Sequence, residues 1–239
     1  MAVETIMECD TIKGIITESK SGRQAILAKQ VIDATGDADI AHLAGAPWRK
    51  APKNELLGVT VTFSLTGVDR KRFLSHVKMN PSTYKDWGVE TSGKEDNMFS
   101  PYLKAPFQLA KEAGEIPGDL EIAGTWSRIS EQGDATYLNI VYILGRDATD
   151  VHDLTLGEVE GRKQVMWATN ALKKYVPGFE NVSLRSFGSS LGIRESRKII
   201  GRYNLTEEDV RNQGRFDDAI GIFPEFLDGC GIVILPTTG

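Results

Sequence analysis

The first 34 residues constrain the fold more than any other stretch, because runs with strand composition alternate there with turn residues. Apolar and β-branched residues recur in residues 3–8, 12–19 and 23–33, and the segments between these runs, CDT and KSG, consist of turn formers. Three such runs separated by tight turns predict an antiparallel meander. The last run ends in VIDA, so we expect a final, buried strand at residues 31–34.

A concentration of ligand-capable groups closes this expected strand. The sequence Asp33-Ala34-Thr35-Gly36-Asp37 offers two carboxylates, a hydroxyl and a glycine. Ligands of open α/β sheets bind at the carboxyl ends of strands, and glycine, which has no Cβ atom, lets a ligand approach the backbone closely. An ordinary turn after a strand uses the same residue types, so the residues alone leave both interpretations open.

Strand and helix signals are interspersed along the rest of the chain. Alternating apolar and polar residues mark the strands, and apolar residues at helical spacing mark the helices. The expected strands cover residues 57–65, 120–129 and 135–144; the expected helices cover residues 38–46, 68–79 and 106–111 and two segments that begin at 155 and 205; residues 80–104 are expected to be irregular. The mixture predicts an α/β or α+β fold class.

Capping patterns predict where three helices start. Asp69 is suited to cap the helix at residues 68–79. Thr155-Leu-Gly-Glu158 has the form of a capping box, in which the Thr oxygen and the Glu carboxylate bind free amides at a helix start. Thr206, followed by Asp209, opens another helix in the same way.

Charge and cysteine content exclude several classes of protein. The 28 Lys and Arg residues against 33 Asp and Glu residues give a net charge of -5, so no general attraction to nucleic acid or an anionic membrane is expected. The N-terminal segment has no long apolar run, which indicates neither a signal peptide nor a membrane anchor and favours a cytoplasmic protein. Two cysteines are too few for a disulfide scaffold or a four-cysteine metal site, and no metal site is predicted.

A second candidate cluster, GIRESR, carries Arg194, Glu195 and Arg197. Two guanidinium groups this close together could clamp a substrate carboxylate or stabilise negative charge on a reduced cofactor. The alternative is a solvated or salt-bridged helix start, in which Arg194 and Arg197 share one face. The residues alone favour this alternative.

Several segments, taken in order, resemble FAD-dependent oxidoreductases of the glutathione-reductase-like type. The meander, IDATGD and the small-residue run to Gly-Ala-Pro carry the resemblance near the N-terminus, and DATD (residues 147–150), VPGFE (176–180) and GIRESRKIIG (192–201) carry it further along. The chain looks most like the family related to the flavin-binding component of heterodisulfide reductases.

The resemblance implies an oxidoreductase in which bound FAD exchanges hydride with a small-molecule substrate. It places cofactor contacts, chiefly through backbone atoms and the Thr hydroxyl, at Asp33, Ala34, Thr35, Gly36 and Asp37. It also makes Arg194 and Arg197 catalytic candidates for substrate or flavin electrostatics. The implied partners are the substrate and either further copies of the chain or a redox protein.

One departure limits the resemblance. Relatives hold the FAD pyrophosphate on a G-x-G-x-x-G turn, and this sequence has no such pattern, because Gly229-Cys-Gly231 lacks the third glycine. We therefore expect an internal portion of a longer flavoprotein, with part of an FAD-binding domain at residues 1–47, a substrate-side domain at 48–216 and a return segment at 217–239. The alternatives are a non-catalytic fragment or interaction domain that cannot bind FAD alone and, last, a nicotinamide-only dehydrogenase.

Overall fold

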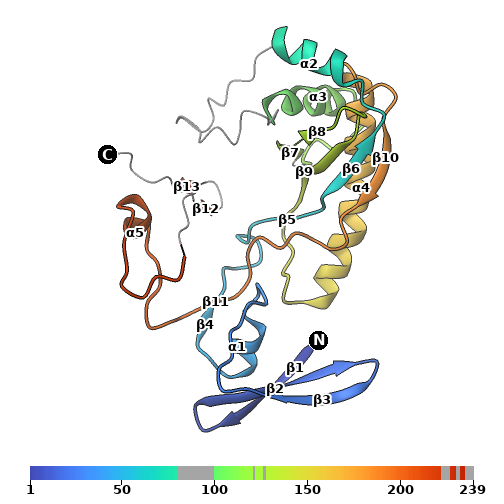
Figure 1. The fold of residues 1–239 in the computed structure, drawn as a ribbon. Coiled ribbons are helices and arrows are strands. Elements are labelled where there is room, and N and C mark those ends of the chain that lie inside the picture. Colours follow the sequence, from blue (N-terminus) through green and yellow to red (C-terminus); the bar gives the residue numbers. More distant parts are fainter. Residues whose placement is uncertain (80–99, 121, 126–127, 222–226, 230–231, 235–239) are drawn as a thin grey trace. The chain divides into compact units, whose positions relative to one another are not determined.

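The fold combines helices with antiparallel strands in two compact units. The computed structural model describes residues 1–79, 100–120, 122–125, 128–221, 227–229 and 232–234. Unit 1 comprises residues 1–55 and 195–239, and unit 2 comprises residues 56–194 (Figure 1). The α/β fold class expected from the sequence is confirmed, while the domain boundaries implied by the resemblance stay predictions.

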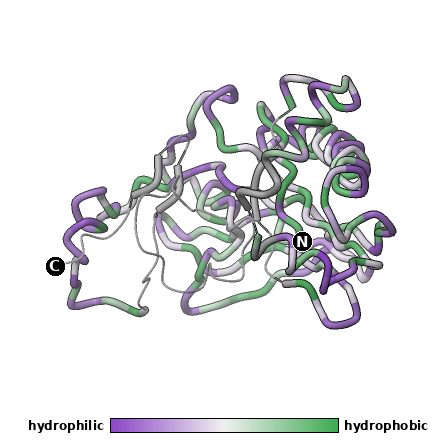
Figure 2. Tube along the Cα trace, turned by 90° about the horizontal axis from the view of Figure 1, so that it is seen from above, coloured by the Kyte–Doolittle hydropathy of each residue, from purple (hydrophilic) through white to green (hydrophobic). Residues whose placement is uncertain are grey.

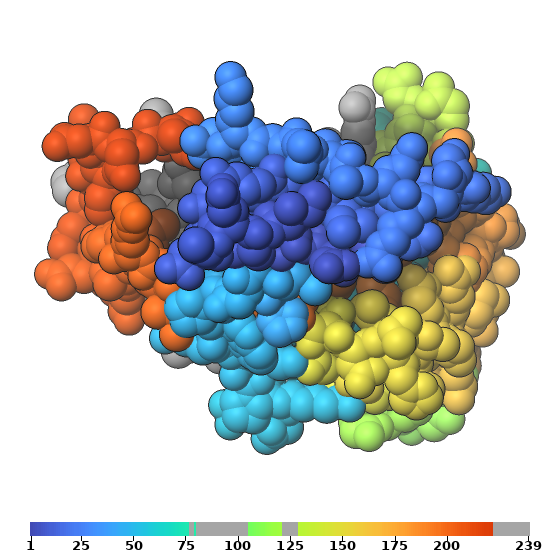
Figure 3. Space-filling view, turned by 90° about the horizontal axis from the view of Figure 1, so that it is seen from below, coloured from blue at the N-terminus to red at the C-terminus, as the bar shows by residue number. Residues whose placement is uncertain are grey.

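Unit 1 begins with the expected meander. Strands β1 (Ala2–Glu8), β2 (Thr11–Ser19) and β3 (Gly22–Leu27) pair antiparallel in the order β1-β2-β3. Gly14 of β2 lies so close to β3 that a Cβ atom would collide with the Ile26 carbonyl oxygen, which makes glycine necessary there. Strand β3 is exposed along its whole length, and Figure 3 shows the meander in blue on the surface.

Residues 31–34 do not form the expected buried strand. They have no regular secondary structure, Val31 is only half-buried and Ile32 is 89% exposed. A strand needs a partner for its N–H and C=O groups, and no strand within the described residues pairs with this segment. The chain instead turns through residues 35–37 into helix α1 (Asp39–Leu43), which confirms the expected helical turns.

Helix α1 packs on the meander and is followed by a two-stranded ladder. The Thr5 hydroxyl donates a hydrogen bond to the Leu43 carbonyl oxygen at 3.1 Å. Strand β4 (Trp48–Arg49) then pairs antiparallel with β11 (Lys198–Ile199) from a distant part of the sequence. This pairing returns the segment around residue 197 to the region that follows the meander.

Helix α5 (Glu207–Arg211) starts as the sequence predicts. Thr206 Oγ1 accepts a hydrogen bond from Asp209 N at 3.2 Å, and the Asp209 carboxylate accepts one from Thr206 N at 2.7 Å. The last described strands, β12 (Leu227–Gly229) and β13 (Ile232–Ile234), pair antiparallel.

Unit 2 is built around an antiparallel sheet. Its strands follow the order β10-β6-β9-β5, and two more strands, β7 and β8, also pair with β9. The bounds are β5 (Val59–Thr60), β6 (Phe63–Thr66), β7 (Ile122–Thr125), β8 (Arg128–Ile129), β9 (Ala135–Ile143) and β10 (Ser183–Phe187). The expected strands at 57–65 and 120–129 are each divided into two short strands, and the one at 135–144 is confirmed as β9.

Helix α4 (Val151–Tyr175) packs on this sheet and supplies much of the core. Its Leu172 and the sheet residue Phe63 are almost completely buried in one hydrophobic cluster. The helix comes close because it carries Gly161, where a Cβ atom would collide with Val61. Hydrophobic and hydrophilic stretches alternate along the trace (Figure 2), as expected for elements that bury one face. Neither α4 nor any other described helix is long and apolar enough to cross a membrane.

The start of α4 corrects the expectation of a capping box at Thr155. The helix begins at Val151, and Asp150 caps it: the carboxylate accepts hydrogen bonds from His152 N at 2.7 Å and Asp153 N at 3.3 Å. Thr155 lies inside the helix, where its hydroxyl donates to the Val151 carbonyl oxygen at 2.9 Å. An upstream carboxylate within reach of two free amides is the stronger cap, and the helix extends to it.

Helix α2 (Arg70–Met79) confirms its predicted cap. The Asp69 carboxylate accepts a hydrogen bond from Arg72 N at 2.9 Å, close to the expected helix start. Residues 80–99, which were expected to be irregular, lie outside the described residues.

Helix α3 (Ser100–Glu112) is longer than the helix expected at residues 106–111. Pro106 lies inside it rather than in its first turn, and residues 100–104, expected to be irregular, are helical. Pro106 cannot donate a backbone hydrogen bond, but Phe107 and Ala110 are fully buried in the core of unit 2. Tertiary packing therefore stabilises a helix that local sequence rules end early.

Candidate functional site

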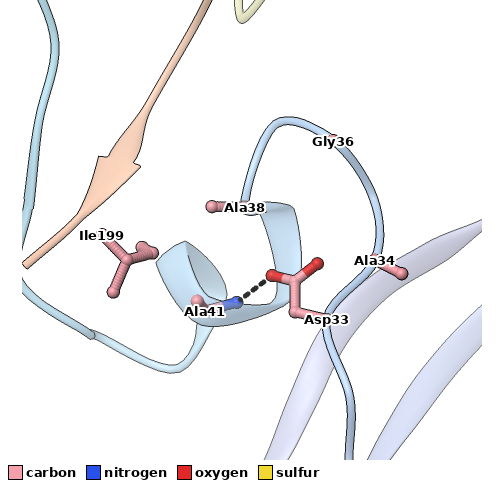
Figure 4. A pocket seen from close by; sticks show the side chains of 6 residues that line it. All are labelled: Asp33, Ala34, Gly36, Ala38, Ala41 and Ile199. Carbon is pink, nitrogen blue, oxygen red and sulfur yellow. Dashed lines mark hydrogen bonds between the residues drawn. The ribbon is translucent and has the colours of Figure 1, made fainter. Parts of the chain in front are cut away.

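The candidate site lies in unit 1, where the DATGD loop (residues 33–37) connects the meander to α1. The loop borders an open hollow of about 380 Å³. The hollow is lined by Asp33, Ala34, Gly36, Ala38, Ala41 and Ile199 (Figure 4). Three of the five loop residues predicted from the sequence thus line the hollow, whereas Thr35 and Asp37 are not part of its lining.

The Asp33 carboxylate organises the loop from inside. Its Oδ2 atom accepts a hydrogen bond from Ala41 N at 2.8 Å (Figure 4), and its Oδ1 atom accepts from Thr35 N at 3.0 Å and from Thr35 Oγ1 at 2.8 Å. Burial raises the pKa of Asp33, but the hydrogen bonds from Ala41, Thr35 and Ile40 outweigh this effect, so the pKa lies below its ordinary value. Asp33 is therefore ionised at neutral pH, and its charge is used to hold the loop.

The Thr35 hydroxyl is also used within the loop. It donates its proton to Asp33 and accepts a hydrogen bond from Asp39 N, at the start of α1, at 2.9 Å. A hydroxyl has one donor and two acceptor lone pairs. Toward a ligand, Thr35 can therefore act only as an acceptor.

The loop backbone leaves several donors available. Gly36 and Ala38 have positive φ angles of 86° and 55°, a left-handed conformation that costs a residue with a Cβ atom about 1–2 kcal/mol. The N–H groups of Gly36, Asp37 and Ala38 make no hydrogen bond to any residue that the structure describes. A Cβ atom on Gly36 would meet no atom within 4 Å, so the backbone there faces open space.

Arg197 reaches the end of the loop from a distant part of the sequence. Its Nε atom donates a hydrogen bond to the Asp37 carbonyl oxygen at 2.9 Å, and its Nη2 atom forms a hydrogen-bonded ion pair with the Asp39 carboxylate. The Arg197 side chain is only 10% exposed. One of the two predicted arginines is therefore brought to the loop, but its guanidinium contacts protein groups.

Arg194 is placed differently. It is exposed and ends unit 2, whereas Arg197 belongs to unit 1. Residues 193–197 have no regular secondary structure and lead into β11, so the interpretation of this segment as a helix start is wrong. The reason is the pairing of β11 with β4, a long-range interaction that local spacing does not reveal.

Three residues that line the hollow were not predicted: Ala38, Ala41 and Ile199. The first two belong to the run of small residues after the loop, and that composition was the available signal. No local signal marks Ile199, which reaches the hollow because β11 returns to β4.

Together these groups offer hydrogen-bond donors and acceptors around a small open hollow. The donors are backbone N–H groups, and the hydroxyl of Thr35, between the lining residues Ala34 and Gly36, can accept. Asp37 Oδ1 has no hydrogen-bond partner among the described residues, but it is buried and does not line the hollow. Such a set suits a ligand that presents both hydroxyl and carbonyl groups.

Comparison with known proteins gives one match. A protein-family model described as FAD dependent oxidoreductase matches residues 1–228. Searches of curated proteins and of solved structures gave no match.

Proposed function

The chain belongs to the FAD dependent oxidoreductase family, whose model covers most of its length, and on that premise we propose that the DATGD loop forms part of an FAD site. FAD is the cofactor of this family. The observation that carries the proposal is the open backbone at Gly36, where neither a side chain nor a neighbouring atom blocks an approaching ligand.

The residues of the loop fit an uncharged portion of FAD. Asp33, Asp37 and Asp39 place three carboxylates within seven residues, and Arg197 forms an ion pair with Asp39 alone among them. An anionic pyrophosphate next to these groups would be repelled. A ribityl hydroxyl or a flavin N–H group can instead donate to the Thr35 hydroxyl oxygen, and ligand oxygens can accept from the free amides of the loop.

The volume of the hollow is consistent with contact to only part of an FAD molecule. A space of about 380 Å³ lies at the small end of ligand pockets, which range from about 300 to 1,000 Å³. We therefore propose that residues 33–37 contact one section of the cofactor. The sequence has no G-x-G-x-x-G turn to bind the pyrophosphate, which is consistent with contact to only one section of FAD.

The proposed reaction is hydride transfer between the flavin and a small-molecule substrate. Bound flavin supplies this redox chemistry, and the protein supplies position, electrostatics and exclusion of water. Arg194, an exposed residue, is proposed to act on an anionic substrate or on negative charge at the flavin. A closer relation to glutathione-reductase-like enzymes and to the flavin-binding component of heterodisulfide reductases, and the division at residues 47 and 216, belong to the same proposal.

The second candidate is a non-catalytic fragment or interaction domain. It is favoured by one observation, the missing glycine turn that would bind the pyrophosphate. The two candidates differ in whether this chain alone binds flavin.

A flavin titration separates them. The purified chain, freed of bound flavin, is titrated with FAD and with riboflavin while flavin fluorescence and the visible spectrum are recorded. Saturable, equimolar binding of FAD, with weaker but measurable binding of riboflavin, supports an FAD site whose loop contacts an uncharged portion. A chain that stays colourless and shows no saturable change with either compound would leave the interaction domain as the better description.

A further inference from the structure

We propose that Arg197 is a positioning residue that locks the DATGD loop in its ligand-binding conformation. This inference rests on the proposed function, because it assigns Arg197 to the same site. It differs from a direct electrostatic role at the flavin, because the guanidinium already binds the Asp37 carbonyl oxygen and the Asp39 carboxylate.

The contacts of Arg197 lie on both sides of a strained residue. Ala38 has a φ angle of 55°, which is unfavourable for any residue with a Cβ atom. Arg197 binds the Asp37 carbonyl oxygen directly before Ala38 and the Asp39 carboxylate directly after it. The guanidinium thus holds the two neighbours of Ala38 and stabilises the left-handed turn between them.

The shape of the guanidinium group is what this role requires. Two acceptors are bound at once by separate nitrogen atoms, Nε and Nη2. Arginine presents such donors in a rigid planar fork, whereas the lysine ammonium acts as a compact point charge on a flexible chain. Arg197→Lys should therefore keep the charge and lose part of the positioning.

The segment that carries Arg197 is itself anchored in unit 1. Ile199 pairs with Trp48 in the ladder of β11 and β4, and Ile200 N donates to the Pro47 carbonyl oxygen at 2.8 Å. Arg197 binds the loop and Ile199 lines the hollow. The anchored segment therefore forms the second side of the candidate site.

The free amides show why this lock matters for binding. The N–H groups of Gly36, Asp37 and Ala38 can meet a ligand together only if the turn keeps its shape. Asp33 fixes the first half of the turn through Thr35 and Ala41. The second half depends on Arg197.

The test combines hydrogen exchange of the ligand-free protein with FAD affinity. The variants are Arg197→Gln, Arg197→Lys and Asp39→Asn, and Arg202→Gln is the matched control at an exposed arginine of the same unit. The exchange reporters are the Asp39 and Ala41 amides, which bind Thr35 Oγ1 and Asp33 Oδ2 in the native loop.

Arg197→Gln should speed exchange at both reporters about tenfold and weaken FAD binding about tenfold, as expected for loss of a charge-assisted pair. Arg197→Lys should give a smaller change in both quantities, and Arg202→Gln none. Asp39→Asn combined with Arg197→Gln should add little to Arg197→Gln alone. Should Arg197→Gln fail to fold, Arg197→Lys and Asp39→Asn provide the same comparison.

Weaker FAD binding with unchanged loop exchange would overturn the positioning role, because it would indicate direct contact with the flavin. Unchanged exchange and unchanged affinity in all variants would overturn it as well. A wild-type chain that binds no FAD contradicts the proposed function instead, and the exchange measurements on the ligand-free protein still decide whether Arg197 holds the loop.

Discussion

At the scale of single residues, the polar side chains of the DATGD loop mainly stabilise the conformation of the loop itself. The Asp33 carboxylate and the Thr35 hydroxyl accept hydrogen bonds from amides of the loop and of α1. These two side chains suggested a ligand site in the sequence, but most of their hydrogen-bonding capacity is already used within the protein. The groups left for a ligand are the backbone amides of residues 36–38 and one acceptor lone pair of the Thr35 hydroxyl. Motif composition indicates where a candidate site lies, but not which atoms remain available to a ligand.

The charge of Asp33 should make the loop sensitive to acid. Because its pKa is lowered in the folded chain, its stabilising contribution is complete above the ordinary aspartate pKa of about 3.9 and is lost as the pH falls through the lower, folded value. Hydrogen-exchange protection at Ala41 should therefore stay constant between about pH 7 and 5 and decrease below about pH 4. In Asp33→Asn, protection of the Ala41 amide should be weak at every pH. Asp10→Asn, a change in an exposed turn, should match the wild type. If protection of the Ala41 amide in the wild type does not change with pH, the proposed role of this carboxylate is contradicted.

At the scale of elements, the sequence predicted the local structures well and their limits less well. The meander, α1, α2 and α5 follow from turn residues, apolar spacing and caps that lie close together in the sequence. The missing strand at residues 31–34, the extension of α3 through Pro106 and the pairing of β11 depend on partners far along the chain. Local patterns do not contain that information.

The cap of α4 gives a direct test at this scale. Asp150→Ala should lower the free energy of unfolding by about 1 kcal/mol, because two amides at the helix start lose their acceptor. Thr155→Ala should be neutral or stabilise by a few tenths of a kcal/mol, roughly, because alanine has the higher propensity inside a helix. Urea unfolding of both variants measures the difference. If Thr155→Ala proves the more damaging change, the helix starts at the capping box after all.

At the scale of the whole molecule, the candidate site depends on a unit that is discontinuous in sequence. Residues 1–55 and 195–239 form unit 1, and both segments contribute to the hollow, through the DATGD loop and through Ile199. The loop half of the site could be predicted from its motif. The half contributed by Arg197 and Ile199 could not be predicted, because it depends on the chain returning to unit 1 after it has formed unit 2. Membership of the FAD dependent oxidoreductase family is the basis of our proposal that this hollow contacts FAD.

The most direct test of the FAD assignment compares the FAD affinity of the wild-type chain with that of Gly36→Ala and Gly22→Ala. Both glycines have positive φ angles, 86° and 92°, and a Cβ atom on either would meet nothing within 4 Å. The two substitutions therefore impose similar strain at φ, but only one places a methyl group at the proposed site. Fluorescence titration should give equal dissociation constants for the wild type and Gly22→Ala and one about tenfold or more higher for Gly36→Ala, a cost of about 1.4 kcal/mol. Equal affinities for all three chains, or no saturable binding by the wild type, would contradict the assignment of residues 33–37 to the FAD site.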